Sequence, residues 1–144
     1  MSEKQIALLV LAALPLWWCL LFHAIARFGG WAKLVTRFRA QTKPQGKSFT
    51  WQSCSLGFAN YSACLTIILS PSGIYLEMFL LLRCGHPALF IPWSQVTKIS
   101  EKQDFWQRYC EVSIGTPHVG IMRLPPRVMK SAKAMLPTLV PDFE

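Results

Sequence analysis

One apolar run near the N-terminus constrains this chain more than any other feature. Residues 6–26, IALLVLAALPLWWCLLFHAIA, contain no Asp, Glu, Lys or Arg. As an α-helix, a run of this length extends about 31 Å, because each residue adds about 1.5 Å. That length matches the hydrocarbon core of a bilayer, which is about 30 Å thick. The run therefore predicts a transmembrane anchor over residues 1–27.

Basic residues follow the run without any acid. Six of them lie between positions 27 and 47, in a chain whose formal net charge is +8: Arg27, Lys33, Arg37, Arg39, Lys43 and Lys47. Before the run, Glu3 and Lys4 cancel. Because Lys and Arg concentrate on the cytoplasmic side of a span, this asymmetry predicts a single-pass protein with its N-terminus outside and its C-terminal domain in the cytoplasm.

A cleaved signal peptide is the competing interpretation, because Ala24-Ile25-Ala26 resembles a cleavage site for small residues. Three features favour the anchor. The run is longer than the apolar part of a signal peptide, the residues before it carry no net side-chain charge, and the positive charge after it opposes export.

Two tryptophans, Trp17 and Trp18, lie deeper in the run than the aromatic belt at a membrane surface. Their depth suggests a contact with the transmembrane helix of a partner protein. The alternative is that both rings simply face lipid.

The segment 28–47 is predicted to form a basic amphipathic helix followed by a short polar linker. Its apolar residues, Trp31, Leu34, Val35 and Phe38, are spaced at i, i+3, i+4 and i+7, which places them on one helical face. A basic helix of this kind suits the membrane interface. The predicted membrane-surface residues are Trp31, Lys33, Arg37, Phe38, Arg39 and Lys43. The alternative is that the apolar face packs on the following domain.

Residues 48–137 have the pattern of six or seven strands followed by one helix, with a tail at 138–144. In 48–56, alternation places Phe49 and Trp51 on one side, and the apolar segment 74–84 is predicted to be a single strand. Short links between strands favour antiparallel pairing. Trp93 is expected to be buried against a C-terminal helix through Val128, Ala132 and Met135.

Three motifs carry a family resemblance: Gly73-Ile-Tyr-Leu76, Leu82-Arg-Cys-Gly-His-Pro87 and Leu89-Phe-Ile-Pro-Trp-Ser-Gln-Val96. Residues 48–137 resemble the bacterial pleckstrin-homology-like domains, which include GRAM-like variants. The resemblance implies an α+β chain whose antiparallel β-sandwich or open barrel is capped by one C-terminal helix. It also implies a bacterial inner membrane. Some relatives bind phosphoinositides through a basic loop between the first two strands, but residues 57–60 here hold no Lys or Arg.

The sequence offers no catalytic, cofactor-binding or metal-binding residues. Its five cysteines form no C-x-x-C pair, and Cys84 with His86 is a lone C-x-H without a second pair at the spacing of a zinc site. A cytoplasmic domain predicts free thiols. The membrane accounts for the basic residues, so we expect no nucleic-acid partner.

Three functions remain open at this point. The first is a membrane-anchored, non-enzymatic interaction module that scaffolds or stabilises a complex of integral membrane proteins. The second is a lipid-sensing domain that binds anionic lipid head groups through its basic helix. The third is an enzyme with a Cys/His site.

Overall fold

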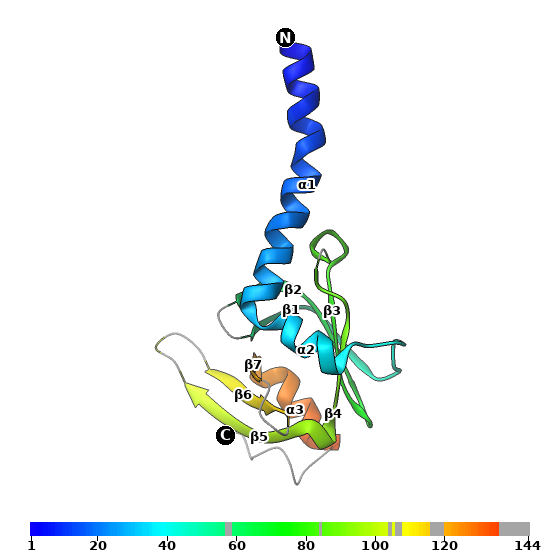
Figure 1. Cartoon of the computed structure of the whole chain (residues 1–144). Coiled ribbons are helices and arrows are strands. Elements are labelled where there is room, and N and C mark those ends of the chain that lie inside the picture. Colours follow the sequence, from blue (N-terminus) through cyan, green and yellow to red (C-terminus); the bar gives the residue numbers. More distant parts are fainter. Residues whose placement is uncertain (57–58, 84, 104, 106–107, 116–119, 136–144) are drawn as a thin grey trace.

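The structure is a computed structural model of the chain, and it describes residues 1–144 except 57–58, 84, 104, 106–107, 116–119 and 136–144. One long helix, α1 (Glu3–Gly29), stands away from a β-rich body (Figure 1). Ser2 Oγ accepts a hydrogen bond from Gln5 N–H, and Gln5 Oε1 accepts one from Ser2 N–H. This reciprocal cap satisfies N–H groups that have no partner within the helix. The helix continues through Pro15 and ends at Gly30, whose φ is 97°.

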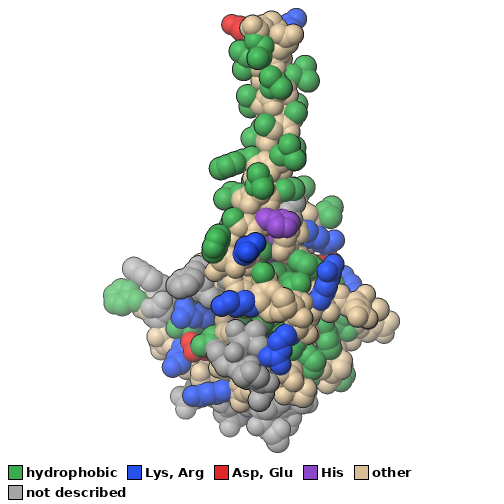
Figure 2. All heavy atoms as spheres, in the orientation of Figure 1, with side chains coloured by type: hydrophobic (Ala, Val, Ile, Leu, Met, Phe, Trp, Pro, Cys, Tyr) green, Lys and Arg blue, Asp and Glu red, His purple; other side chains and the backbone are tan. Residues whose placement is uncertain are grey.

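The two parts of α1 have different surroundings. Residues 3–18 are exposed, and Figure 2 shows hydrophobic side chains along this length. By length and composition this helix could cross a membrane, although a signal sequence meets the same test. Near its C-terminal end, Ile25 packs against the core and Ala26 is buried. The apolar helix is therefore attached to the body by its last turns.

In the described part of the chain, seven antiparallel strands form one open sheet in the order β4-β3-β2-β1-β7-β6-β5. Strands adjacent in sequence pair with each other except β4 and β5, which are the two edges, and β1 pairs with β7. This confirms the predicted antiparallel sheet and C-terminal helix. The bounds are β1 Lys47–Leu56, β2 Ala59–Ser70, β3 Gly73–Met78, β4 Leu89–Pro92, β5 Val96–Gln103, β6 Arg108–Ile114, β7 Gly120–Leu124, α2 Trp31–Phe38 and α3 Pro126–Met135.

The structure differs from the predicted strands in two places. The segment 74–84 is not one strand, because β3 ends at Met78 and a 3₁₀ turn, η1 (Leu80–Leu82), follows. In β1 the pairing register shifts on both sides of Gln52, and Trp51 has a φ of 55°. A bulge of this kind changes the direction of the side chains, so Trp51 is exposed while Phe49 packs against the core.

Trp93 is buried, as predicted, although it lies in a 3₁₀ turn, η2 (Trp93–Gln95), rather than in a strand. Its indole Nε1 donates a hydrogen bond to the Ser70 carbonyl at 2.9 Å. Val128 and Ala132 of α3 belong to the same core. The expected contact with the Met135 side chain, and the tail at 138–144, lie outside the described residues.

Candidate functional site

Four aromatic side chains join α1 to the body, and we call them the aromatic junction: Phe22, Trp31, Tyr61 and His86. The His86 ring lies 6.0 Å from the Phe22 ring, 5.2 Å from Trp31 and 5.3 Å from Tyr61, all edge to face. Trp31 Nε1 donates a hydrogen bond to the Pro87 carbonyl at 3.0 Å. Because these residues come from α1, α2, β2 and the β3–β4 connection, they hold the apolar helix against the sheet.

Two polar side chains of the aromatic junction, those of Tyr61 and His86, are hydrogen-bonded to each other. Tyr61 Oη and His86 Nε2 share a hydrogen bond of 2.9 Å, and both residues are buried. Burial raises the pKa of Tyr61 above its ordinary value, and the nearby Cys54 and Cys64 act in the same direction. Tyr61 therefore stays a neutral hydroxyl at physiological pH, partnered by the His86 ring.

The structure divides the predicted membrane-surface residues into two groups. Trp31 and Phe38 are 0% and 6% exposed and belong to the core. Lipid cannot reach them, which corrects their assignment to the membrane surface. The face of α2 that was open to two interpretations packs on protein, because β4 and the aromatic junction lie against it. Lys33, Arg37, Arg39 and Lys43 are exposed.

Trp17 and Trp18 of α1 also differ in their surroundings. Trp17 is 64% exposed, and its contact with a partner helix stays a prediction. Trp18 is used within the chain: its Nε1 donates to the Leu81 carbonyl at 2.7 Å, and its ring lies 5.0 Å from the Phe22 ring. Trp18 thus contacts the chain's own β3–β4 connection, and its contact with a partner helix also stays a prediction.

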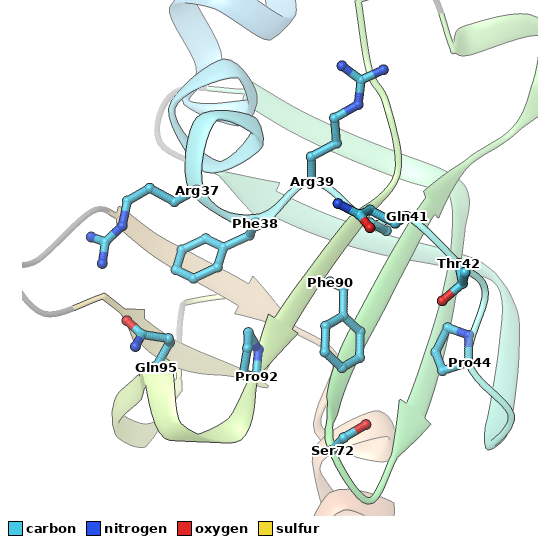
Figure 3. A pocket seen from close by; sticks show the side chains of 11 residues that line it. Arg37, Phe38, Arg39, Gln41, Thr42, Pro44, Ser72, Phe90, Pro92 and Gln95 are labelled. Carbon is cyan, nitrogen blue, oxygen red and sulfur yellow. The ribbon is translucent and has the colours of Figure 1, made fainter.

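A groove of about 670 Å³ opens beside the C-terminal end of α2, and we call it the basic groove (Figure 3). In this view the Phe38 and Phe90 rings lie at the centre, while the Arg37 side chain points to the left and that of Arg39 points upward, so the two guanidinium groups extend in different directions. The Arg37 guanidinium stacks 5.4 Å from the Phe38 ring. The lining residues are Arg37, Phe38, Arg39, Ala40, Gln41, Thr42, Pro44, Ser72, Phe90, Pro92 and Gln95.

Two residues that line the basic groove, Arg37 and Arg39, are positively charged. None of its described lining residues is acidic. The carboxylate of Glu77 lies close to Lys43 Nζ, at 3.5 Å, and to Arg83 Nη2, at 2.8 Å, so its charge is matched outside the groove. A second groove, of about 390 Å³, is lined by Arg108 and Arg123, which approach the carboxylates of Glu101 and Glu111.

The cysteines of the body offer little nucleophilic chemistry. Cys54 and Cys110 are buried free thiols, and burial raises the pKa of both, in Cys110 to about 11. The thiolate is the reactive form, so these residues are inert at neutral pH. Cys19 in α1, outside the domain for which free thiols were predicted, is bonded in a disulfide, whereas Cys54, Cys64 and Cys110 of the body are free. Across the described parts of the chain, no three His, Cys, Asp or Glu side chains gather at a metal-binding distance.

Comparisons with protein-family models, with curated proteins and with solved structures gave no match.

Sequence reasoning identified Arg37 and Arg39 but missed the opposite wall of the basic groove. Phe90, Pro92 and Gln95 come from β4 and η2, about fifty residues further along the chain. One signal is present in the sequence, because Pro92 has no N–H to donate to a ladder and therefore favours an edge or a bend at this position. The segment that follows α2 runs along this edge, with Ala40 N–H donating to the Ala88 carbonyl at 2.9 Å.

Proposed function

We propose that the chain is a membrane-anchored, non-enzymatic interaction module, with α1 as its transmembrane helix. The observation that carries this proposal is the aromatic junction, through which the apolar helix is packed on the body rather than tethered by a linker. A body held in this way keeps its basic groove close to the membrane. A partner that is itself an integral membrane protein can then reach the groove with a short segment.

The ligand we propose for the basic groove is an extended acidic segment of such a partner. Arginine is suited to carboxylates, which it binds through two parallel hydrogen bonds. The Phe90 ring and the prolines at positions 44 and 92 are half-buried, and they offer apolar contacts for neighbouring side chains. The sheet edge contributes little, because Pro92 has no N–H and the Arg39–Ala40 segment already runs along β4.

Anionic lipid head groups are the second candidate ligand. Arg37 in the last turn of α2 and Arg39 directly after this helix are exposed, and a basic residue near an anionic membrane surface contributes about 1 kcal/mol. A head group would use the two arginines but not the apolar wall formed by Phe90 and Pro92. The apolar wall is the reason for ranking the peptide first.

Site-specific photo-crosslinking from position 41 tests this function. Gln41 is exposed and lines the basic groove, so a photoreactive amino acid in its place reaches any occupant in native membranes. We expect a protein adduct that disappears in the Arg37→Glu/Arg39→Glu variant. The control, Arg127→Glu/Lys130→Glu, changes the net charge equally on the exposed face of α3 and should keep the adduct.

Two other outcomes of this experiment would decide against an acidic peptide in the basic groove. A phospholipid adduct at position 41 that depends on the two arginines selects the lipid-sensing function. An adduct that survives the Arg37→Glu/Arg39→Glu change contradicts the basic groove as the binding site.

Two further assignments belong to this proposal. The body lies on the cytoplasmic side of a bacterial inner membrane, supported by the six basic residues that follow the apolar run. The body is related to the pleckstrin-homology-like domains, supported by seven antiparallel strands followed by one helix.

A further inference from the structure

The connection between β3 and β4 carries an exposed apolar turn, Phe79-Leu80-Leu81-Leu82, which we call the FLLL turn. Leu80 and Leu81 are 68% and 66% exposed, and Phe79 is exposed as well. Trp51, whose ring lies 5.4 Å from that of Phe79, extends the same apolar surface. Large neighbouring apolar side chains on a surface mark a contact with a partner or with lipid.

The FLLL turn lies beside α1. Trp18 Nε1 in the middle of α1 donates a hydrogen bond to the Leu81 carbonyl at 2.7 Å. Further along the connection, Gly85 approaches α1 so closely that a Cβ on it would lie 2.9 Å from His23 Cα. Figure 1 shows this connection, in green next to β3, rising from the sheet toward α1.

The depth of Trp18 places the FLLL turn within the membrane if α1 spans it. A core of about 30 Å needs about 20 helical residues, which the apolar run from Ile6 to Ala26 provides. Trp18 precedes Ala26 by eight residues, which corresponds to about 12 Å along the helix. Because the Leu81 carbonyl accepts a hydrogen bond from Trp18, it lies near this depth, below the surface of the apolar layer.

The backbone of the FLLL turn is suited to an apolar environment. Unpaired N–H and C=O groups cost several kcal/mol in hydrocarbon, but most of those here have partners. Phe79 N–H donates to the Cys64 carbonyl, Leu82 N–H to the Phe79 carbonyl and Arg83 N–H to the Leu80 carbonyl, at 2.9, 2.8 and 3.4 Å. The Leu81 carbonyl accepts from Trp18.

Charged groups occur at the base of the turn rather than at its tip. Arg83 Nε donates to the Met78 carbonyl at 2.9 Å, and its Nη2 contacts Glu77 Oε1 at 2.8 Å. From tip to base, the leucines therefore come first, and Arg83 with the Glu77 carboxylate follows. This order matches the passage from acyl chains to head groups.

We infer that the FLLL turn is a second membrane contact, inserted among lipid acyl chains alongside α1. The inference rests on the proposed transmembrane role of α1. Two contacts on one rigid body fix its orientation, so the basic groove is presented at a set angle to the bilayer. A single helix would leave the tilt of the body relative to the bilayer less restricted.

Photo-crosslinking of the full-length chain in phospholipid bilayers tests the inference. A photoreactive amino acid replaces, one at a time, Leu81 in the FLLL turn, Leu11 in the exposed part of α1, and Phe105 between β5 and β6. All three side chains are exposed, and β5 is the sheet edge opposite β4. We expect lipid adducts from positions 81 and 11 and none from position 105.

The three positions separate failure of this inference from failure of the anchor. Lipid adducts from position 11 but not from position 81 would overturn the inserted turn and leave the transmembrane helix standing. A protein adduct from position 81 would give the turn to a partner protein instead. No lipid adduct from position 11 would overturn the transmembrane helix, and the inserted turn with it.

Discussion

Replacing Trp31 with alanine is expected to cost about 3–5 kcal/mol of unfolding free energy, the usual range for a buried aromatic residue. The Trp31 side chain is fully buried, packs edge to face on Tyr61 and His86, and donates a hydrogen bond to the Pro87 carbonyl. Small domains are stable by only about 5–15 kcal/mol. The variant should therefore show a strongly lowered Tm when the full-length chain is heated in mild detergent.

Trp17→Ala is the matched control, because Trp17 is also an indole near the body but is 64% exposed. Its Tm should stay close to that of the unmodified chain. Equal, small losses in both variants would mean that Trp31 faces lipid after all and that α2 lies in the membrane interface.

Trp93→Ala is expected to have an effect of similar size, about 3–5 kcal/mol. Trp93 is buried in the core shared with α3. Trp93→Phe keeps a ring and removes the bond to the Ser70 carbonyl, which leaves a buried acceptor unpaired and costs about 1–3 kcal/mol. Thermal unfolding should thus rank the chains as unmodified, Trp93→Phe and Trp93→Ala, in order of falling Tm.

An exposed indole gives the comparison for this series. Trp51→Ala, at a position that is largely exposed, should change the Tm little in detergent. If Trp93→Ala also leaves the Tm unchanged, the inner and outer faces of the protein are reversed at η2.

The elements that local patterns specify strongly were predictable from the sequence. An apolar run of this length without charge has few alternatives to a long exposed helix, and α1 forms there. Pro125-Pro126 followed by apolar residues at helical spacing is typical of a helix start, and α3 begins at Pro126. Short links and β-forming residues predicted the antiparallel sheet.

Whether lipid or protein covers an apolar face was harder to predict, for a physical reason. The apolar face of α2 satisfies the same pattern whether lipid or protein covers it, so Trp31 and Phe38 were open to both interpretations. The residues of the FLLL turn were predicted to continue a strand, because a run of uncharged apolar residues is typical of a buried segment. The basic groove combines the end of α2 with β4 and η2. These segments are far apart in the sequence, and no local pattern predicts that they lie together.

α1 is proposed to cross the membrane and to hold the body on the cytoplasmic side. A dual reporter fused after Glu144 measures this directly, with a fluorescent part that matures only in the cytoplasm and a phosphatase part that is active only outside it. We expect fluorescence without phosphatase activity, from a protein whose mass still includes residues 1–26. Phosphatase activity, or a mature N-terminus at Arg27, would contradict the proposed anchor and its orientation.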